Sequence, residues 1–263
     1  MFTKKNLLGV GFTDEKLGDI LEYIDTILKK KEKKYYFVTP NPELLMIAHK
    51  NSEYKKLLND ADLALIDGVG IIIAGKILGR PLKHKISGVD LIENICRRVA
   101  EKPITIGFLG GWPGVAELTA ECLRSRYPVL KVAFAVSELS ELEANPEEVS
   151  SRQYTVFSKE TKKLNTKYNI PHTDVLFVAF GSPKQEIWIK EHLENLPVTI
   201  AMGVGGAFDM ISGKTRRAPV FVRRMGLEWL FRLITQPWRV KRQLRLLEFM
   251  FLVLREKISP AQS

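Results

Sequence analysis

The sequence predicts an α/β fold: a Rossmann-like, mainly parallel sheet with helices on both faces, followed by a C-terminal helical appendage. Short runs of β-branched residues alternate along the chain with longer helical patterns, which is typical of βαβ units. Runs such as Val175–Phe180 are apolar without alternation, as expected of strands that are covered on both faces. The chain has 263 residues, 45% of them hydrophobic, which suffices for one large domain and an appendage.

Seven strands are expected in this sheet. They are Leu7–Gly11, Tyr35–Val38, Leu63–Ile66, Ile104–Leu109, Val132–Val136, Val175–Phe180 and Val198–Gly203. Among the intervening helices, one is expected to open at Thr13–Glu15 and end near Lys31, and another has Pro42 in its first turn. The polar stretch 137–171 is interpreted as a peripheral helical connection.

Charge separates the appendage from the body. Residues 212–263 hold 12 Lys and Arg against 3 Asp and Glu, whereas the remaining 211 residues hold 28 against 27. We therefore expect a catalytic domain over residues 1–212 and a basic, amphipathic appendage over 213–263, with helical patterns at 220–235 and 239–257. Such a segregated charge indicates an anionic partner, which on composition alone is a nucleic acid, a partner helix or a membrane surface.

Several features favour a cytoplasmic protein. Cys96 and Cys122 lie in predicted helices and form no spaced disulfide framework, and the N-terminal apolar run is too short for a signal peptide. The longest apolar stretch, Leu246–Leu254, is interrupted by Glu248 and is far shorter than a membrane span. Any membrane contact of this chain is therefore expected to be peripheral.

Polar residues and glycines follow five of the predicted strands. They are Thr39-Pro40-Asn41, Asp67-Gly68, Gly110-Gly111, Gly181 to Glu186 and Gly203 to Gly206. Ligands of open parallel sheets bind outside the carboxyl ends of the strands, so these five segments are expected to converge on one crevice.

Asp67 is the first candidate for a general base, because a carboxylate at the mouth of a crevice can take the proton of an attacking hydroxyl. The alternative is that Asp67 caps the helix that starts at Val69. Thr39 and Asn41 suit sugar hydroxyls but equally suit a simple turn. Lys184 and Gln185 lie at a helix start, where amides and an ammonium can surround an anionic ligand.

The glycine-rich segment Gly107 to Gly114 has neither the dinucleotide-binding spacing nor a Gly-Lys-Ser/Thr sequence, which weakens a reading as an NAD or ATP site. The alternative is a tight turn from strand to helix. The four histidines are scattered, and no Asp-x-Asp occurs. We therefore expect no metal and no cofactor.

The appendage carries three arginines that suit phosphate recognition, Arg232, Arg239 and Arg242. Trp229, Trp238 and the apolar run after Leu246 would supply the apolar side of a helix pair at a membrane surface. The alternative is that the aromatic residues pack on the body or on a second subunit. The sequence therefore leaves open whether the protein forms a homo-oligomer.

Read together, these segments resemble the WecG/TagA/CpsF family of glycosyltransferases over nearly the whole chain. The shared pieces are Thr39-Pro40-Asn41, Asp67-Gly68, Ser87 to Asp90, Phe108 to Gly111, Gly181 to Glu186, Gly203 to Asp209, Arg217 to Pro219, and Gly226 to Trp229 with Arg232. The resemblance implies the metal-independent, inverting transfer of N-acetylmannosamine or a related sugar from a UDP donor. The implied acceptor is undecaprenyl-diphosphate-linked N-acetylglucosamine, in wall teichoic acid or surface polysaccharide synthesis at the inner face of the cell membrane.

The resemblance also implies roles for individual residues. Asp67 would be the catalytic base, and Thr39, Asn41 and Gln185 would line its pocket. Asp209 would meet the nucleoside, and Arg232, Arg239 and Arg242 the UDP diphosphate. The remaining substrate-binding candidates are Lys85, Gly110, Gly111, Gly181, Lys184, Gly205 and Gly206. Lys85 stands where family members often carry arginine, which keeps the charge but loses the bidentate fork.

Two alternatives remain at this stage. A basic, Rossmann-like nucleic-acid-binding module would explain the charged appendage, although the neutral body with glycines at its strand ends argues against it. A nucleotide-sugar epimerase or dehydrogenase would explain the sheet but lacks its cofactor fingerprint. We therefore expect a UDP-sugar, a lipid-linked acceptor and an anionic membrane surface as partners, and no nucleic acid.

Overall fold

The computed structural model describes residues 2–138, 170–237 and 240–258. By their contacts these residues form two compact units. Unit 1 comprises residues 1–17, 38–87 and 216–263, and unit 2 comprises residues 18–37 and 88–215. The expected division into a catalytic domain over residues 1–212 and an appendage over 213–263 stays a prediction.

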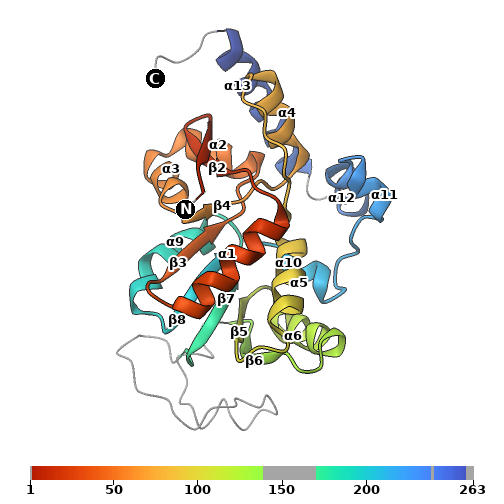
Figure 1. The fold of residues 1–263 in the computed structure, drawn as a ribbon. Helices are drawn as coiled ribbons and strands as arrows, with labels where there is room; N and C mark the ends of the chain where they lie inside the picture. Colours follow the sequence, from red (N-terminus) through yellow and green to blue (C-terminus); the bar gives the residue numbers. More distant parts are fainter. Residues whose placement is uncertain (1, 139–169, 238–239, 259–263) are drawn as a thin grey trace. The chain divides into compact units, whose positions relative to one another are not determined.

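The elements of unit 1 come from three stretches of the chain (Figure 1). They are β1 (Lys4–Leu7), β2 (Val10–Thr13), α2 (Pro42–Lys50), α3 (Ser52–Asn59), β4 (Leu63–Ala64), α4 (Val69–Ile77), α11 (Val220–Arg224), α12 (Glu228–Thr235) and α13 (Val240–Ile258).

The elements of unit 2 alternate between strand and helix. They are α1 (Leu17–Lys30), β3 (Tyr35–Val38), α5 (Gly88–Val99), β5 (Thr105–Gly110), α6 (Val115–Arg126), β6 (Lys131–Val136), β7 (Thr173–Ala179), α9 (Lys184–His192), the 3₁₀ turn η1 (Leu193–Asn195), β8 (Val198–Gly203) and α10 (Ala207–Ile211).

The main sheet has six strands in the order β4-β3-β8-β7-β5-β6, and the strand pairs from β3 to β6 are parallel. Helices flank it, with α6 against β5 and β6, and α9 against β7 and β8. Every residue of β7 and β8 is buried, as expected of central strands covered on both faces. The predicted Rossmann-like fold with C-terminal helices is confirmed.

The prediction of a strand at Leu7–Gly11 is wrong. This segment is the turn of an antiparallel hairpin, in which β1 pairs with β2 and Lys4 lies opposite Thr13. Leu8 and Gly9 both have positive φ, 54° and 81°, which reverses the chain within an apolar run. Thr13 then forms a parallel bridge with Leu65, so the hairpin lies beside β4 within unit 1.

Two helix expectations also need correction. The first helix begins at Leu17 rather than at Thr13–Glu15, because Asp14 has another role that is described below. The helical pattern over 220–235 is interrupted at Gly226, whose φ of 75° separates α11 from α12. Of the expected peripheral connection, residues 139–169 lie outside the described part of the chain.

The helix α13 belongs to the packing of unit 1, where it contacts α2 and α4 (Figure 1). Its residues Phe249 and Val253 are fully buried. Arg245 pairs with Glu43 at 2.7 Å, and Lys50 pairs with Glu248 at 3.3 Å. Burial of one apolar face therefore holds this helix against the segments that follow β3 and β4, and two ion pairs at its border add little.

Candidate functional site

In unit 1 the segments that follow β3 and β4 lie side by side. The N–H of Asp67 donates a hydrogen bond of 3.1 Å to the carbonyl of Pro40, and the N–H of Leu65 donates to Val38. The Thr39-Pro40-Asn41 turn and the Asp67 turn are thus adjacent, as the strand-end rule predicts.

Asn41 has a structural function at the start of α2. It is the N-cap of α2, and its Oδ1 accepts a hydrogen bond of 3.1 Å from the N–H of Leu44. Pro42 occupies the first turn, where its missing N–H costs nothing. The segment thus forms the turn that leads into α2, which was one of its two interpretations. Binding of a sugar by Thr39 and Asn41 stays a prediction.

Asp67 is half-buried at the start of α4, but it is not the N-cap residue of that helix. The N-cap is Gly68, which has a φ of 86°. A β-carbon on Gly70, one turn further on, would come within 2.7 Å of Pro42 Cγ, so α4 packs closely on the first turn of α2. The carboxylate is therefore carried on a turn that is fixed by the packing of two helices.

Backbone contacts place Lys85 beside the segment that carries Asp67. Ile66 and Lys85 form a parallel bridge, and the N–H of Ile86 donates 2.8 Å to the carbonyl of Ile66. The Lys85 side chain is exposed. Four predicted site residues, Thr39, Asn41, Asp67 and Lys85, are thus brought together in unit 1; we refer to them as the Asp67 cluster.

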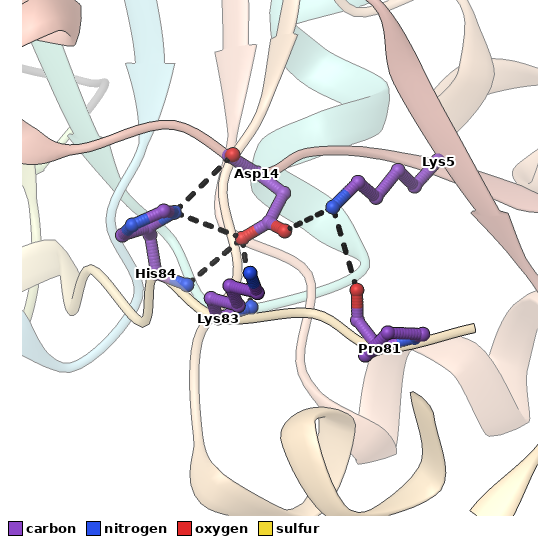
Figure 2. A network of polar contacts seen from close by, with 5 residues as sticks. All are labelled: Lys5, Asp14, Pro81, Lys83 and His84. Carbon is purple, nitrogen blue, oxygen red and sulfur yellow. Dashed lines mark hydrogen bonds and ion pairs between the residues drawn. The ribbon is translucent and has the colours of Figure 1, made fainter. Parts of the chain in front are cut away.

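Asp14 holds the segment directly before Lys85, a function that no local sequence pattern indicated. Its Oδ1 accepts hydrogen bonds from the N–H groups of Lys83 at 2.9 Å and His84 at 2.8 Å (Figure 2). Its Oδ2 pairs with the Lys5 ammonium at 2.7 Å. The side chain is 1% exposed, so these donors replace water around a buried carboxylate.

The same contacts set the charge state of Asp14. Burial alone raises the pKa of the carboxyl, but the hydrogen bonds from Lys5, His84 and Lys83 outweigh it and lower the pKa to about 2. Asp14 is therefore ionised at neutral pH and fixes residues 83 and 84, directly before Lys85.

In unit 2 the ends of β5 and β7 meet through glycines. Gly110 and Gly111 both have positive φ, 93° and 100°, and the N–H of Gly111 donates 3.1 Å to the carbonyl of Ala179. A β-carbon at Gly110 would approach Phe180 to 2.6 Å, so glycine is required by both conformation and space. Gly181, with a φ of 76°, then turns the chain out of β7.

Gln185 ties the end of β7 to the end of β8. Its Oε1 accepts a hydrogen bond of 2.9 Å from the N–H of Gly205, and its Nε2 donates 2.6 Å to Glu186 Oε1. Gln185 and Glu186 are 3% and 1% exposed. A β-carbon on Gly203 would lie 2.9 Å from Gln185 Nε2, so the amide fills the space that this glycine leaves. Lys184 is exposed beside it.

The buried carboxylate of Glu186 was missed by the sequence interpretation, which took the residue for part of a helix start. It also accepts 2.8 Å from the hydroxyl of Ser182. Glu186 and Gln185 together therefore fix the loops at the ends of β7 and β8.

The third segment in unit 2 follows β8. Gly205 has a φ of 53°, Gly206 is the exposed N-cap of α10, and Asp209 lies in the first turn of that helix. The Asp209 Oδ2 lies 3.6 Å from the position that a β-carbon on Gly206 would take. Every predicted site residue of unit 2 therefore lies at the carboxyl ends of the adjacent strands β5, β7 and β8.

Of the three arginines of the appendage, only Arg232 has a side chain among the described residues. Arg232 is half-buried in α12 and lies 3.6 Å from Glu228 across one helical turn. Arg239, like Trp238, lies outside the described residues, and so does the side chain of Arg242. Their proposed contact with a diphosphate stays a prediction.

The described residues contain neither a candidate metal-binding cluster nor a helix suited to crossing a membrane. No group of three or more histidine, cysteine or acidic side chains within 2–138, 170–237 and 240–258 could hold a metal ion. Over the same ranges, no helix combines the length and the apolar character needed to cross a membrane.

A parallel sheet with glycine turns at its strand ends, and a carboxylate on one of the turns, is typical of α/β proteins that bind ligands outside the carboxyl ends of their strands. The model of the glycosyl transferase WecG/TagA/CpsF family matches residues 5–263. The chain belongs to this family and is a glycosyltransferase. This membership selects the transferase among the three classes that the sequence left open.

Curated relatives are similar over almost their whole length. One from Bacillus spizizenii is 30% identical over 251 residues, which are 95% of this chain and 91% of the relative. One from Staphylococcus aureus is 29% identical over 255 residues, which are 97% and 93% of the two chains. Both are named N-acetylglucosaminyldiphosphoundecaprenol N-acetyl-beta-D-mannosaminyltransferase.

Proposed function

We propose that this protein transfers N-acetylmannosamine, or a related sugar, from a UDP donor to undecaprenyl-diphosphate-linked N-acetylglucosamine. The observation that carries the proposal is the similarity over 95% and 97% of the chain to two relatives whose names state this sugar and this acceptor. The product would serve wall teichoic acid or surface polysaccharide synthesis.

Asp67 is the general base of the proposed reaction. Its carboxylate takes the proton of an acceptor hydroxyl, and the hydroxyl oxygen attacks the anomeric carbon of the donor sugar. The bond from that carbon to the UDP oxygen breaks, UDP leaves with the electron pair, and the anomeric configuration inverts. Thr39 and Asn41, next to Asp67 in unit 1, hold sugar hydroxyls, and Lys85 meets a substrate phosphate.

The strand ends of unit 2 serve the donor in this proposal. The nucleotide can approach the backbone closely at Gly110, Gly111, Gly181, Gly205 and Gly206, because no side chain intervenes there. Asp209 meets the nucleoside, and Lys184 together with Arg232, Arg239 and Arg242 neutralises the charge that develops on UDP. Gln185 acts by positioning the Gly203–Gly206 loop. The protein's cations take the place of a metal, so the proposal includes no cofactor.

We further propose that α13 brings the enzyme to the inner face of the cell membrane. Leu247, Phe251, Leu254 and Ile258 follow one another at helical spacing and are 68%, 70%, 49% and 85% exposed. Phe249 and Val253, on the face packed within unit 1, are buried. An apolar stripe on the outer side of a basic helix suits a bilayer interface, where a lipid-linked acceptor resides.

The test of the base is transfer from a panel of UDP-sugars to a soluble lipid-diphosphate N-acetylglucosamine analogue, followed by product mass, with and without a chelator. Asp67→Asn should reduce turnover at least about a thousandfold while thermal unfolding is unchanged, because amides do not accept the proton. The matched control is Asp19→Asn, an exposed carboxylate in the first turn of α1. Near-normal turnover of Asp67→Asn would remove the base assignment, and an inactive unmodified chain would remove the proposed reaction.

A further inference from the structure

Unit 1 contains a pocket of about 460 Å³, and of its lining residues only Lys85 has a role in the reaction proposed above. It lies between the first turns of α4, the segment that carries Lys85, and α11 with the turn after it. Gly226 closes one side, where a β-carbon would come within 2.9 Å of Val69 Cγ2. The pocket therefore depends on close packing between two distant stretches of the sequence.

Three cations line the pocket: Lys85, Arg223 and Arg224. Lys85 and Arg224 are exposed, and no ion pair involves either of them in the part of the chain that the structure describes. The Nε of Arg223 donates 3.0 Å to the carbonyl of Ala218, which fixes its guanidinium group. No acidic residue belongs to the lining, so these charges repel one another and favour a multivalent anion.

The rest of the lining is aliphatic. Val69 and Ile72 come from α4, and Val220 and Met225 come from the opposite wall. Val220 and Met225 are 54% and 68% exposed, and Phe221 beside them is 66% exposed. The lining contains no aromatic ring and no amide, hydroxyl or carboxylate side chain that could recognise a base or a ribose. The cations therefore suit the diphosphate of a nucleoside diphosphate, but the aliphatic side chains of the lining do not suit its base and ribose.

The pocket adjoins the turn that carries Asp67. Val69 lies two residues after Asp67, and Lys85 is bridged to Ile66. The pocket and Asp67 therefore share one short segment of unit 1, so a sugar whose hydroxyl approaches Asp67 can carry an attached anionic group toward the pocket.

We propose that this pocket binds the diphosphate of the lipid-linked acceptor and the isoprene units next to it, an inference that rests on the proposed function. The cations hold the diphosphate, and the aliphatic walls with Phe221 receive the start of the hydrocarbon chain. Arg223 and Arg224 are thereby acceptor-binding residues, separate from the arginines assigned to UDP.

The first test is direct binding, which does not require activity. Farnesyl diphosphate, farnesol, inorganic diphosphate and UDP are titrated into the full-length chain in a calorimeter. Farnesyl diphosphate should bind at least about tenfold more tightly than farnesol or inorganic diphosphate, because only it uses both parts of the pocket. Arg224→Gln and Arg223→Gln should each weaken this binding about tenfold. Arg216→Gln, an exposed arginine outside the lining, should leave it unchanged.

The second test separates the acceptor from the donor in steady-state transfer. Arg224→Gln should raise KM for the lipid acceptor about tenfold with KM for the UDP-sugar unchanged, and Met225→Gln should reduce the preference for long over short lipid chains. A rise in KM for the UDP-sugar alone would assign the pocket to the donor diphosphate and overturn the proposal. Unchanged farnesyl diphosphate binding in both arginine variants would also overturn it, whereas binding without any sugar transfer would contradict only the proposed reaction.

Discussion

The carboxylate of Asp14 accepts a hydrogen bond of 2.8 Å from the backbone N–H of His84, across 70 residues of sequence. It accepts a second from Lys83 and pairs with Lys5 (Figure 2). One buried charge at the end of β2 thus holds the segment that leads to Lys85 and to the proposed acceptor pocket.

Asp14 should make unfolding depend on pH in the acid range. Its pKa is about 2 in the folded chain and 3.8 ordinarily, so the ionised form is favoured by folding. The resulting stabilisation, about 2 kcal/mol, is fully present above about pH 5 and is lost as the pH falls from there through about 4 to about 2. We expect the free energy of unfolding of Asp14→Asn, measured by urea titration, to fall less steeply over that range than that of the unmodified chain. Asp19→Asn is the matched control, and parallel curves for Asp14→Asn and the unmodified chain would contradict the prediction.

Gln185 should matter for stability as well as for the loop after β8. Gln185→Met keeps the shape of the side chain but leaves the N–H of Gly205 and the buried carboxylate of Glu186 without this amide. We expect a loss of about 2–4 kcal/mol in the free energy of unfolding, measured by denaturant titration. Lys184→Met, the same change on the exposed neighbour, should stay within about 0.5 kcal/mol of the unmodified chain. Equal stability of the two variants would show that the amide does not hold these loops.

Gly226 should be more sensitive to substitution than another glycine with the same backbone conformation. Gly226 and Gly213 have φ values of 75° and 80°, but only Gly226 has a close neighbour, Val69. Gly213→Ala should show the backbone strain alone, about 1 kcal/mol. Gly226→Ala should cost a further 1–3 kcal/mol, roughly, because the new methyl group overlaps Val69. Thermal and denaturant unfolding of both variants measure the difference, and equal costs would mean that α4 and the α11–α12 turn separate easily.

The exposed stripe of α13 should govern membrane binding. The double variant Leu247→Gln and Phe251→Gln should bind vesicles of anionic lipid at least about tenfold more weakly in sedimentation, because less apolar surface enters the bilayer. Its unfolding should be unchanged, since both side chains are exposed.

Val129→Gln is the control for this experiment, because Val129 is an apolar residue of unit 2 that is 60% exposed and does not belong to the stripe. Undiminished vesicle binding by the double variant would remove α13 as the membrane contact.

Much of the fold followed from local patterns. The central strands were predictable because Val175–Phe180 and Val198–Gly203 are apolar throughout, as strands buried on both faces must be. The hairpin at Leu8–Gly9 was not predictable, because a positive φ at a leucine has no sequence signal. The break at Gly226 did have a sequence signal, namely a glycine within a helical pattern. Only the packing against Val69 shows why the chain turns there.

The sequence by itself determined the parallel sheet, the segments at its strand ends and the family, because hydrophobic period and ordered motifs are properties of neighbouring residues. Only the tertiary structure showed that Asp14 holds the segment before Lys85, that Gln185 and Glu186 fix two loops, and that Arg223 and Arg224 share a pocket with Lys85. These functions belong to partners far apart in the sequence. An aspartate or arginine has the same local pattern whether water or a distant backbone group meets its charge, so folding alone distinguishes the two.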